Sequence, residues 1–261
     1  MHSTDISSVR TSQKSDAGLS CKNLSRQISG NWIWSKINLH LAPGDKLALS
    51  GSSGSGKSLL LRTLAGLDVI ESGLSGETGT INFDGISLHD WEMPQYRTKV
   101  SYIPQNPVFF DETVETNLKS AFQLKAHQHR HYDQKQILAW LEQFSLPTAA
   151  GNSSGIGDYS EFLQRPAKEL SGGEAQITAL LRVLQLEPQV LLLDEPTASL
   201  DAVLTGRFEY LLEKWQKELP DSNSDTANTK PQRAWIWVSH NPDQLQRMCR
   251  NMFSLESENG N

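Results

Sequence analysis

The chain has few cysteines and no long apolar run, and both absences restrict what it can be. Its two cysteines, Cys21 and Cys249, lie far apart among 261 residues, so no disulfide framework exists and a reducing cytosol is the simplest compartment. No apolar stretch approaches the roughly 20 residues needed to cross a bilayer, so any role at a membrane must come through a partner. The first 17 residues are polar and lack the apolar core of a signal peptide, which predicts a disordered tail.

A surplus of basic charge is also absent. The 24 Lys and Arg residues are outnumbered by 30 Asp and Glu residues, which gives a net charge of −6. A broad nucleic-acid surface needs grouped Lys and Arg side chains, so we expect no nucleic-acid partner. The length and the 37% apolar content are those of a soluble globular protein with one large domain or two small ones.

The order of strand and helix patterns predicts an α/β fold. Fully apolar runs at 47–49 and 190–193 are typical of parallel strands covered on both faces, and 100–103 and 234–239 read as further strands. Partial alternation over 32–41 and 80–83 predicts an N-terminal antiparallel sheet with one wet face. Helices are predicted at 58–67, 114–124, 132–144, 172–186 and 201–218, so that about 106–187 forms a helical subdomain of a domain over 18–255. The polar stretch 220–233 predicts a flexible surface loop, and 256–261 a second tail.

Residues 51–58, GSSGSGKS, have the Gly-x-x-x-x-Gly-Lys-Ser spacing of a phosphate-binding loop and stand between a predicted strand and a predicted helix. In this pattern Lys57 reaches the β- and γ-phosphates and the Ser58 hydroxyl binds Mg²⁺. The N-terminus of the following helix adds its positive end. The phosphates of a nucleotide are therefore expected against the loop residues Gly51, Ser52, Ser53, Gly54, Ser55 and Gly56.

Three polar residues follow two further core strands. Asp194 and Glu195 come directly after an apolar strand, at the edge where open α/β sheets bind ligands. Two adjacent acids there would be costly without a metal ion or substrate, so we expect Asp194 to hold Mg²⁺ through water and Glu195 to polarise the attacking water. His240 follows another core strand and is expected to contact the γ-phosphate.

A second Ser-Gly-Gly segment, LSGGEAQ at 170–176, also opens a predicted helix but carries no lysine. Together with the phosphate loop, SYIPQ ending at Gln105, LLLDEP, SLD at 199–201 and WVSH at 237–240, it occurs in the order found in ABC-transporter ATPase subunits. The chain resembles that family over about residues 19–255. The LSGG segment carries most of this specificity, since many other NTPases share the phosphate loop.

The resemblance implies a role for each matching residue. Two chains would hold two ATP molecules head to tail, and the signature residues of one chain would close over the ATP of the other. Gln105 would contact Mg²⁺ and the attacking water, and Asp201 would lie at the dimer seam. The signature residues that act on the partner's ATP would be Ser171, Gly172, Gly173 and Glu174, the last in place of a common glutamine.

Two segments leave alternatives open. The family usually stacks an aromatic ring on adenine, and here Arg26 falls near that place, with Trp32 as the second candidate. The HQHRH segment at 127–131 could bind a transition metal through imidazole, but it lacks companion ligands and reads better as a solvated loop.

Four kinds of ABC protein contain this ATPase unit and are considered as assignments for the chain. Repair and chromosome ABC proteins carry long coiled coils, and translation factors carry two ATPase units, neither of which is present. A regulatory dimer acting on a non-transport membrane machine would look the same as a transporter subunit and remains the alternative. The segment 106–122 resembles exporters, and the whole chain most resembles iron-export ATPases of the FetA type. This implies a permease partner and a place on the inner face of the cell membrane.

Overall fold

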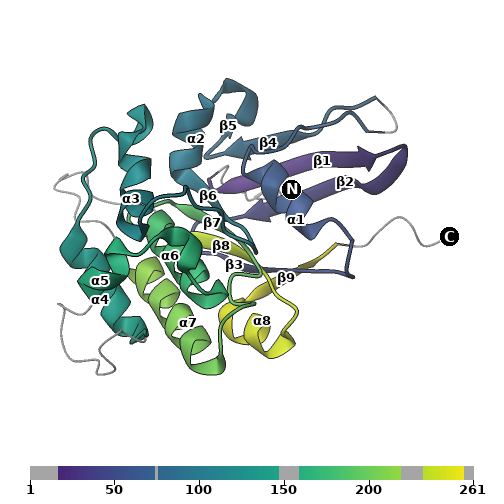
Figure 1. Cartoon of the computed structure of the whole chain (residues 1–261). Coiled ribbons are helices and arrows are strands. Elements are labelled where there is room, and N and C mark those ends of the chain that lie inside the picture. The colour runs from purple at the N-terminus through teal and green to yellow at the C-terminus, as the bar shows by residue number, and fades with distance from the viewer. Residues whose placement is uncertain (1–16, 74–75, 147–158, 219–231, 256–261) are drawn as a thin grey trace, which may run out of the picture.

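A five-stranded parallel sheet forms the centre of the molecule (Figure 1). The structure is a computed structural model and describes residues 17–73, 76–146, 159–218 and 232–255. Every pairing between neighbouring strands of this sheet is parallel, so the carboxyl ends of its strands meet at one edge. The strand order is β6 (Val100–Ile103), β7 (Val190–Asp194), β8 (Ala234–Val238), β3 (Lys46–Ser50) and β9 (Asn251–Ser254).

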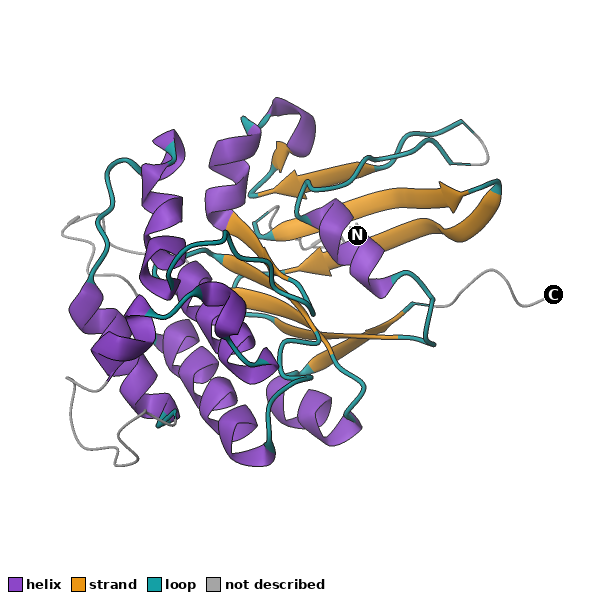
Figure 2. Cartoon of the chain, in the orientation of Figure 1, coloured by secondary structure: helices purple, strands orange, loops and turns teal. Residues whose placement is uncertain are grey.

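A second, antiparallel sheet is built mainly from the N-terminal part of the chain. Its order is β2 (Asn31–Leu41), β1 (Leu19–Ile28), β4 (Thr80–Phe83) and β5 (Ile86–Ser87). The long pair β1 and β2 is interrupted by register shifts between Cys21 and Gln27, which bend the ribbon. Figure 2 shows this sheet beside the parallel one, with α1 between them. The predicted combination of parallel and antiparallel sheets is confirmed.

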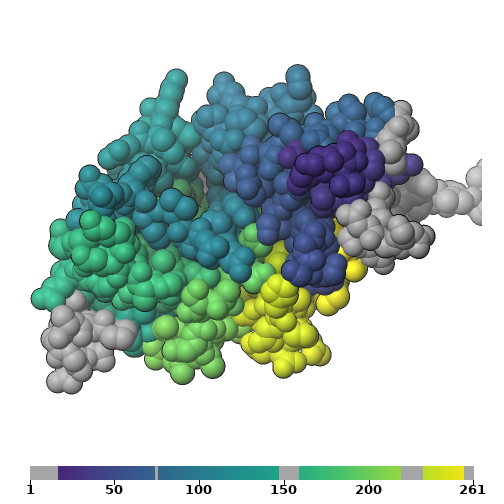
Figure 3. All heavy atoms as spheres, turned by 45° about the vertical axis from the view of Figure 1, so that its right-hand side comes forward, coloured from purple at the N-terminus to yellow at the C-terminus, as the bar shows by residue number. Residues whose placement is uncertain are grey.

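Most helices lie on the other side of the parallel sheet. In the space-filling view the teal-to-green helical residues and the purple N-terminal strands occupy opposite sides of the molecule (Figure 3). The α-helices are α1 (Lys57–Leu64), α2 (Met93–Lys99), α3 (Val114–Lys119), α4 (Gln134–Phe144), α5 (Tyr159–Gln164), α6 (Gly172–Leu184), α7 (Ala202–Lys217) and α8 (Pro242–Met248). Short 3₁₀ turns are η1 (Leu88–Asp90), η2 (Ser120–Gln123), η3 (Lys125–His127) and η4 (Ala167–Glu169).

The two faces of the parallel sheet are buried in two separate apolar clusters. Leu191 and Leu193 of β7 pack into a cluster with the helices α3 to α7, whereas Leu192 between them packs toward α1 and the antiparallel sheet. Every residue of β7 and β8 is buried, which explains why their sequences are continuously apolar instead of alternating. This double burial holds the ends of the strands rigidly at the edge where the polar residues follow.

Several elements differ from the sequence expectations. The helix expected over 114–124 ends at Lys119, and a 3₁₀ turn follows it. Strands β1 and β9 and helices α2, α5 and α8 were not predicted, because each is short or lacks a regular period. The predicted tails, apart from Ala17, and most of the predicted loop 220–233 lie outside the described residues.

The predicted loop 220–233 extends one residue too far, because Arg233 is packed in the fold. Its side chain is buried, and its guanidinium donates hydrogen bonds to the carbonyl oxygens of Trp215 and Glu218 at the end of α7. The guanidinium also lies over the Trp215 ring, 5.0 Å from its centre. A cation is favourable at a helix C-terminus, where carbonyl groups lack partners. Residue 233 therefore belongs to the packed fold and not to a free loop.

Within the described ranges, no helix has both the length and the apolar character needed to cross a membrane.

Candidate active site

The phosphate loop connects β3 to α1 at the carboxyl edge of the sheet. Lys57 is 8% exposed, and its ammonium group donates to the carbonyl oxygens of Gly51 and Ser52, at 2.9 and 2.8 Å. Gly56 precedes α1 with a φ of 87°, and a Cβ atom there would lie 2.5 Å from Cγ2 of Ile33. Only glycine therefore lets the loop approach β2 this closely.

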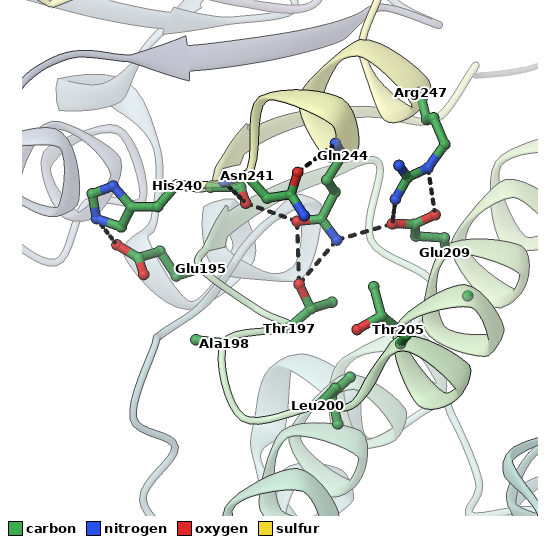
Figure 4. Close-up of a pocket in the computed structure, with 13 residues that line it drawn as sticks. Glu195, Thr197, Ala198, Leu200, Thr205, Glu209, His240, Asn241, Gln244 and Arg247 are labelled. Carbon is green, nitrogen blue, oxygen red and sulfur yellow. Dashed lines mark hydrogen bonds and ion pairs between the residues drawn. The ribbon is translucent and has the colours of Figure 1, made fainter.

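Glu195 brings two other predicted catalytic residues together. Its carboxylate lies 2.9 Å from Nε2 of His240 (Figure 4). It also accepts a hydrogen bond of 3.2 Å from Nε2 of Gln105. Its backbone has a φ of 46°, in the left-handed region that a non-glycine residue seldom occupies. Strained backbone of this kind is often found at functional sites.

A cavity of about 460 Å³ lies over the phosphate loop. Its lining includes Lys57 and Ser58 of the phosphate loop and helix α1, together with Gln105, Glu195 and His240. Since these residues come from the ends of four different strands, the fold alone assembles them. The cavity can hold phosphate groups between a cation and a carboxylate with a histidine partner.

Asp194 is 3% exposed at the end of β7, and its carboxylate accepts a hydrogen bond of 2.9 Å from the hydroxyl of Tyr102 on β6. Burial, and then the neighbouring carboxylate, raise the pKa of Tyr102, so its hydroxyl keeps the proton that it donates. Sequence reasoning missed Tyr102, because its partner lies 92 residues away.

The residues expected to hold Mg²⁺ offer only oxygen ligands of the kind this cation prefers. These are the hydroxyl of Ser58, the amide oxygen of Gln105 and the carboxylate of Asp194. Two of them, Ser58 and Gln105, line the cavity itself. The described residues hold no cluster of three His, Cys, Asp or Glu that could bind a metal ion. A Mg²⁺ ion that takes its other ligands from phosphate and water fits this donor set.

Arg26, the first candidate for the base contact, does not line the cavity over the phosphate loop. The Arg26 guanidinium pairs with the carboxylates of Asp68 at 3.0 Å and Glu71 at 3.2 Å, which keeps it away from the cavity. The cavity wall is formed there by Ile28 and Ile33. Neither Arg26 nor Trp32, the second candidate, is part of that wall. The contact of Arg26 with the base therefore stays a prediction from the resemblance.

The signature residues stand apart from the cavity of their own chain. Ser171 is the N-cap of α6, where its hydroxyl accepts a hydrogen bond from the Glu174 backbone and the Glu174 carboxylate accepts one from the Ser171 backbone. Gly172 and Gly173 pack against Ser199, so a Cβ atom on either would lie about 3.1 Å from it. None of these four signature residues lines the cavity over the phosphate loop.

The glutamate in place of the usual glutamine has a structural partner. Burial alone would raise the pKa of the Glu174 carboxyl, but hydrogen bonds from Arg165 and Ser171 outweigh it and lower the pKa. The Arg165 ion pair is 2.8 Å long. Glu174 thus stays ionised and fixes the start of α6. Asp201, the expected seam residue, caps α7 through a 2.8 Å bond from the Leu204 backbone.

Two buried glutamines join the loops around Glu195, and neither was predicted as a functional residue. Gln176 donates to the backbone oxygens of Gln105 and Glu195, at 3.3 and 3.4 Å, and accepts from the Ser199 backbone at 3.0 Å. Gln244 of α8 contacts the side chains of Thr197 and Ser239 on neighbouring loops and of Glu209 on α7. The sequence signal available for Gln176 was a polar residue in the apolar stripe of a predicted helix, whereas Gln244 lies in a helix that was not predicted.

His127 of the HQHRH segment is also buried, whereas a solvated loop was expected. Burial is the main cause that lowers its pKa, followed by the charges of Arg130 and His129. Its packing in η3 makes it part of the helical layer.

The sequence matches the ABC transporter family over residues 34–198. The chain belongs to this family. It is 32% identical to "Probable iron export ATP-binding protein FetA" of Escherichia coli (strain K12), over 82% of this chain and 80% of the relative. It is also 32% identical to "Nickel import ATP-binding protein NikO" of Rhodobacter capsulatus, over 85% of this chain and 78% of the relative.

Solved structures of ABC proteins share the fold. A dimeric ATP-binding cassette in a post-hydrolysis state with ADP and Pi superposes with a TM-score of 0.71 at 21% identity, covering 92% of this chain and 96% of that one. A bacterial Atm1-family ABC exporter with ATP bound superposes with a TM-score of 0.70 at 19% identity, covering 92% of this chain and 37% of that one. As a member of the family, the chain is the ATP-binding subunit of an ABC transporter and an ATP hydrolase that uses Mg²⁺.

Proposed function

We propose that this ABC ATPase drives export of a metal ion, with iron as the first candidate, through a separate membrane permease. Both importers and exporters are among its relatives, so the direction rests on two observations. One is the exporter-like segment 106–122 after Gln105, and the other is the similarity to an iron-export ATPase over four fifths of both chains. The subunit would act on the inner face of the cell membrane, bound there by the permease.

The proposed chemistry is the transfer of the γ-phosphoryl group of ATP to water. Lys57 and the backbone of the loop bind the β- and γ-phosphates, while Glu195 orients the attacking water and His240 contacts the γ-phosphate. Ser58, Gln105 and Asp194, the last through water, hold Mg²⁺, which offsets charge on the phosphates when bound. One observation carries these roles: the side chains of Gln105 and His240 both contact the carboxylate of Glu195.

The complete site is proposed to need a second copy of the chain. The phosphate cavity contains a lysine and a carboxylate but none of the signature residues, whose backbone N–H groups open a helix elsewhere on the surface. A helix N-terminus attracts anions, so α6 of one copy suits the γ-phosphate held by the other. Asp201 would lie at the seam between the copies. Hydrolysis would then occur only in the closed dimer.

The base of the nucleotide is proposed to lie against Ile28 and Ile33, which line the cavity beside the phosphate loop. Their aliphatic side chains offer apolar contact without hydrogen bonds, so we expect weak discrimination between ATP and GTP.

Co-purification followed by transport tests the whole proposal. The tagged subunit is expected to retain one multi-span membrane protein from detergent extracts, and vesicles holding both are expected to move iron in an ATP-dependent way. The vesicles should be compared with ones that carry Lys57→Ala. Capture of a membrane protein without any ATP-dependent flux of metal ions would contradict the transport proposal. It would favour the alternative, a regulatory ATPase that controls another membrane machine.

A further inference from the structure

Gln244 is a buried polar side chain that lines a cavity of about 670 Å³ beside the candidate active site. It lies on α8 and is only 2% exposed. Its amide nitrogen lies 2.9 Å from the Glu209 carboxylate and 3.0 Å from the Thr197 hydroxyl. Its amide oxygen lies 2.8 Å from the Ser239 hydroxyl and 3.2 Å from that of Thr197 (Figure 4). All its hydrogen-bonding capacity is therefore directed at three neighbouring segments.

The orientation of this amide follows from chemistry. The Glu209 carboxylate can only accept hydrogen bonds, so the amide nitrogen of Gln244 must face it. The amide oxygen then faces Ser239, whose hydroxyl donates to it and accepts from the backbone of Asn241 at 3.1 Å. Arg247 holds Glu209 in place from the other side with a 3.0 Å ion pair.

The partners of Gln244 are close in sequence to the catalytic residues. Ser239 directly precedes His240, and Thr197 is two residues beyond Glu195. Glu195 and His240 meet at 2.9 Å, although they leave the ends of two different strands. Gln244 is thus a single side chain that bridges both loops just behind that contact (Figure 4).

We propose that Gln244 is a positioning residue for ATP hydrolysis, which holds the Glu195 and His240 loops in register through Thr197 and Ser239. It does not line the phosphate cavity, so its contribution is to the geometry of the reaction and not to nucleotide affinity. This inference rests on the roles proposed above for Glu195 and His240.

Exchanging the amide of Gln244 and the carboxylate of Glu209 tests the proposal. Gln244→Glu sets a second carboxylate against Glu209, which pushes the bridge apart, and kcat is expected to fall about 10- to 100-fold. KM for ATP should change by no more than about twofold, because the phosphate loop is untouched. Glu209→Gln alone keeps an acceptor for Gln244 and should be mild. The double variant Gln244→Glu/Glu209→Gln restores a donor and an acceptor in reversed order, and kcat should recover to within about threefold of Glu209→Gln.

Two further variants separate positioning from folding. Gln244→Met removes the hydrogen bonds without adding charge and should show the same fall in kcat at constant KM. Gln216→Glu is the matched control, since the Gln216 amide also joins two segments, at Gly44 and Arg233, but far from the cavity. It should lower the melting temperature and leave kcat unchanged.

The outcomes distinguish this inference from the function on which it rests. Wild-type kcat in Gln244→Glu, or a double variant as slow as Gln244→Glu, would overturn the positioning role. A parallel Glu195→Gln variant that hydrolyses ATP at the wild-type rate would instead overturn the proposed site. A loss of activity in Gln244→Glu that is matched by Gln216→Glu would reduce Gln244 to a contributor to stability.

Discussion

Glu195 combines two features that are unfavourable unless the residue is used. Its backbone occupies the left-handed region, which costs about 1–3 kcal/mol for a residue with a side chain. Its carboxylate is mostly buried and contacts His240 and Gln105. The hydrogen bond from its backbone N–H to the Val238 carbonyl holds the Glu195 backbone at the strand ends, where its carboxylate meets these two partners.

Glu195→Gln should retain nucleotide binding and lose turnover. The amide keeps the shape and the contact with Gln105 but cannot draw a proton from water, and hydrolysis should fall about 10²- to 10⁴-fold. Phosphate release measures the rate, and size-exclusion chromatography with Mg-ATP should show a stable dimer. Hydrolysis at the wild-type rate would remove Glu195 from the proposed role.

If the base of the nucleotide lies against Ile28, an aromatic ring at that position should raise the affinity for nucleotide. Ile28→Tyr would supply a ring at the cavity wall, and stacking on a base adds about 1–3 kcal/mol with little regard to base identity. ATP and GTP affinities should therefore both rise, by about tenfold. Arg26→Ala is the companion variant: it breaks the pairs with Asp68 and Glu71 and should lower stability without changing affinity. Titrations with fluorescent nucleotides measure the affinity of each variant. Weaker binding by Arg26→Ala, together with no gain in affinity in Ile28→Tyr, would favour Arg26 as the residue that contacts the base.

At the scale of elements, helix α6 joins the two halves of the proposed sandwich. Its first residues carry the signature, and Gln176 one turn further on contacts the loops of Gln105, Glu195 and Ser199. Movement of α6 against the sheet would therefore shift the loop of Glu195, the carboxylate that we propose as catalytic. This coupling lies within one helix and needs no longer pathway.

Ser171→Arg should block hydrolysis and leave ATP binding to the monomer unchanged. The bulky cation would fill the face that is proposed to close on the partner's nucleotide. The change also removes the α6 N-cap, which costs about 0.5–2 kcal/mol, so the control is Asp133→Arg, which removes the N-cap of α4 in the same way. Monomer affinity comes from titration of the dilute protein, below the concentration at which two copies associate, and turnover from phosphate release. Loss of ATP binding by the Ser171→Arg monomer alone would contradict a site split between copies.

Local sequence patterns were sufficient for most core elements and for the motif residues. Apolar runs predicted β3, β7 and β8, because burial on both faces removes alternation. The Gly-Lys-Ser and Asp-Glu motifs each lie at a strand end, so topology alone brings them together. The pairs Tyr102–Asp194 and Gln244–Thr197 join residues 92 and 47 positions apart, and no local pattern specifies such contacts. The ion pairs of Arg26 with Asp68 and Glu71, 42 and 45 positions away, are contacts of the same kind.

On the scale of the whole molecule, the loop after Gln105 is held firmly while it exposes apolar side chains. Arg182 lies over the Phe109 ring at 4.8 Å and donates to the Val108 carbonyl at 3.1 Å. Asn117 is buried and bonds both backbone groups of Phe110, at 2.8 and 3.2 Å. The side chains of Val108 and Phe110 are nevertheless 79% and 63% exposed. A fixed backbone lowers the entropy cost of binding, so this segment suits a docking surface.

The structure divides the apolar residues of this loop into two groups with different predicted effects. Phe109 packs against the core beneath Arg182, so Phe109→Ala should lower the melting temperature. Phe110 and Val108 face solvent and would contact the permease that we propose as partner. Phe110→Ala should leave the fold and the basal ATPase rate unchanged but weaken capture of the permease by about tenfold or more, since exposed aromatic residues often dominate binding energy.

A matched control comes from Met252 on the edge strand β9, which is 66% exposed on a different element. Met252→Ala removes a comparable apolar side chain and should alter neither capture nor transport. The measurements are a pull-down of the co-expressed permease and metal efflux from vesicles, each beside the ATPase rate of the isolated subunit. Phe110→Ala that assembles and transports like the wild type would move the docking surface to another face. Equal losses in Phe110→Ala and Met252→Ala would show that the effect follows from lost apolar surface in general and not from this loop.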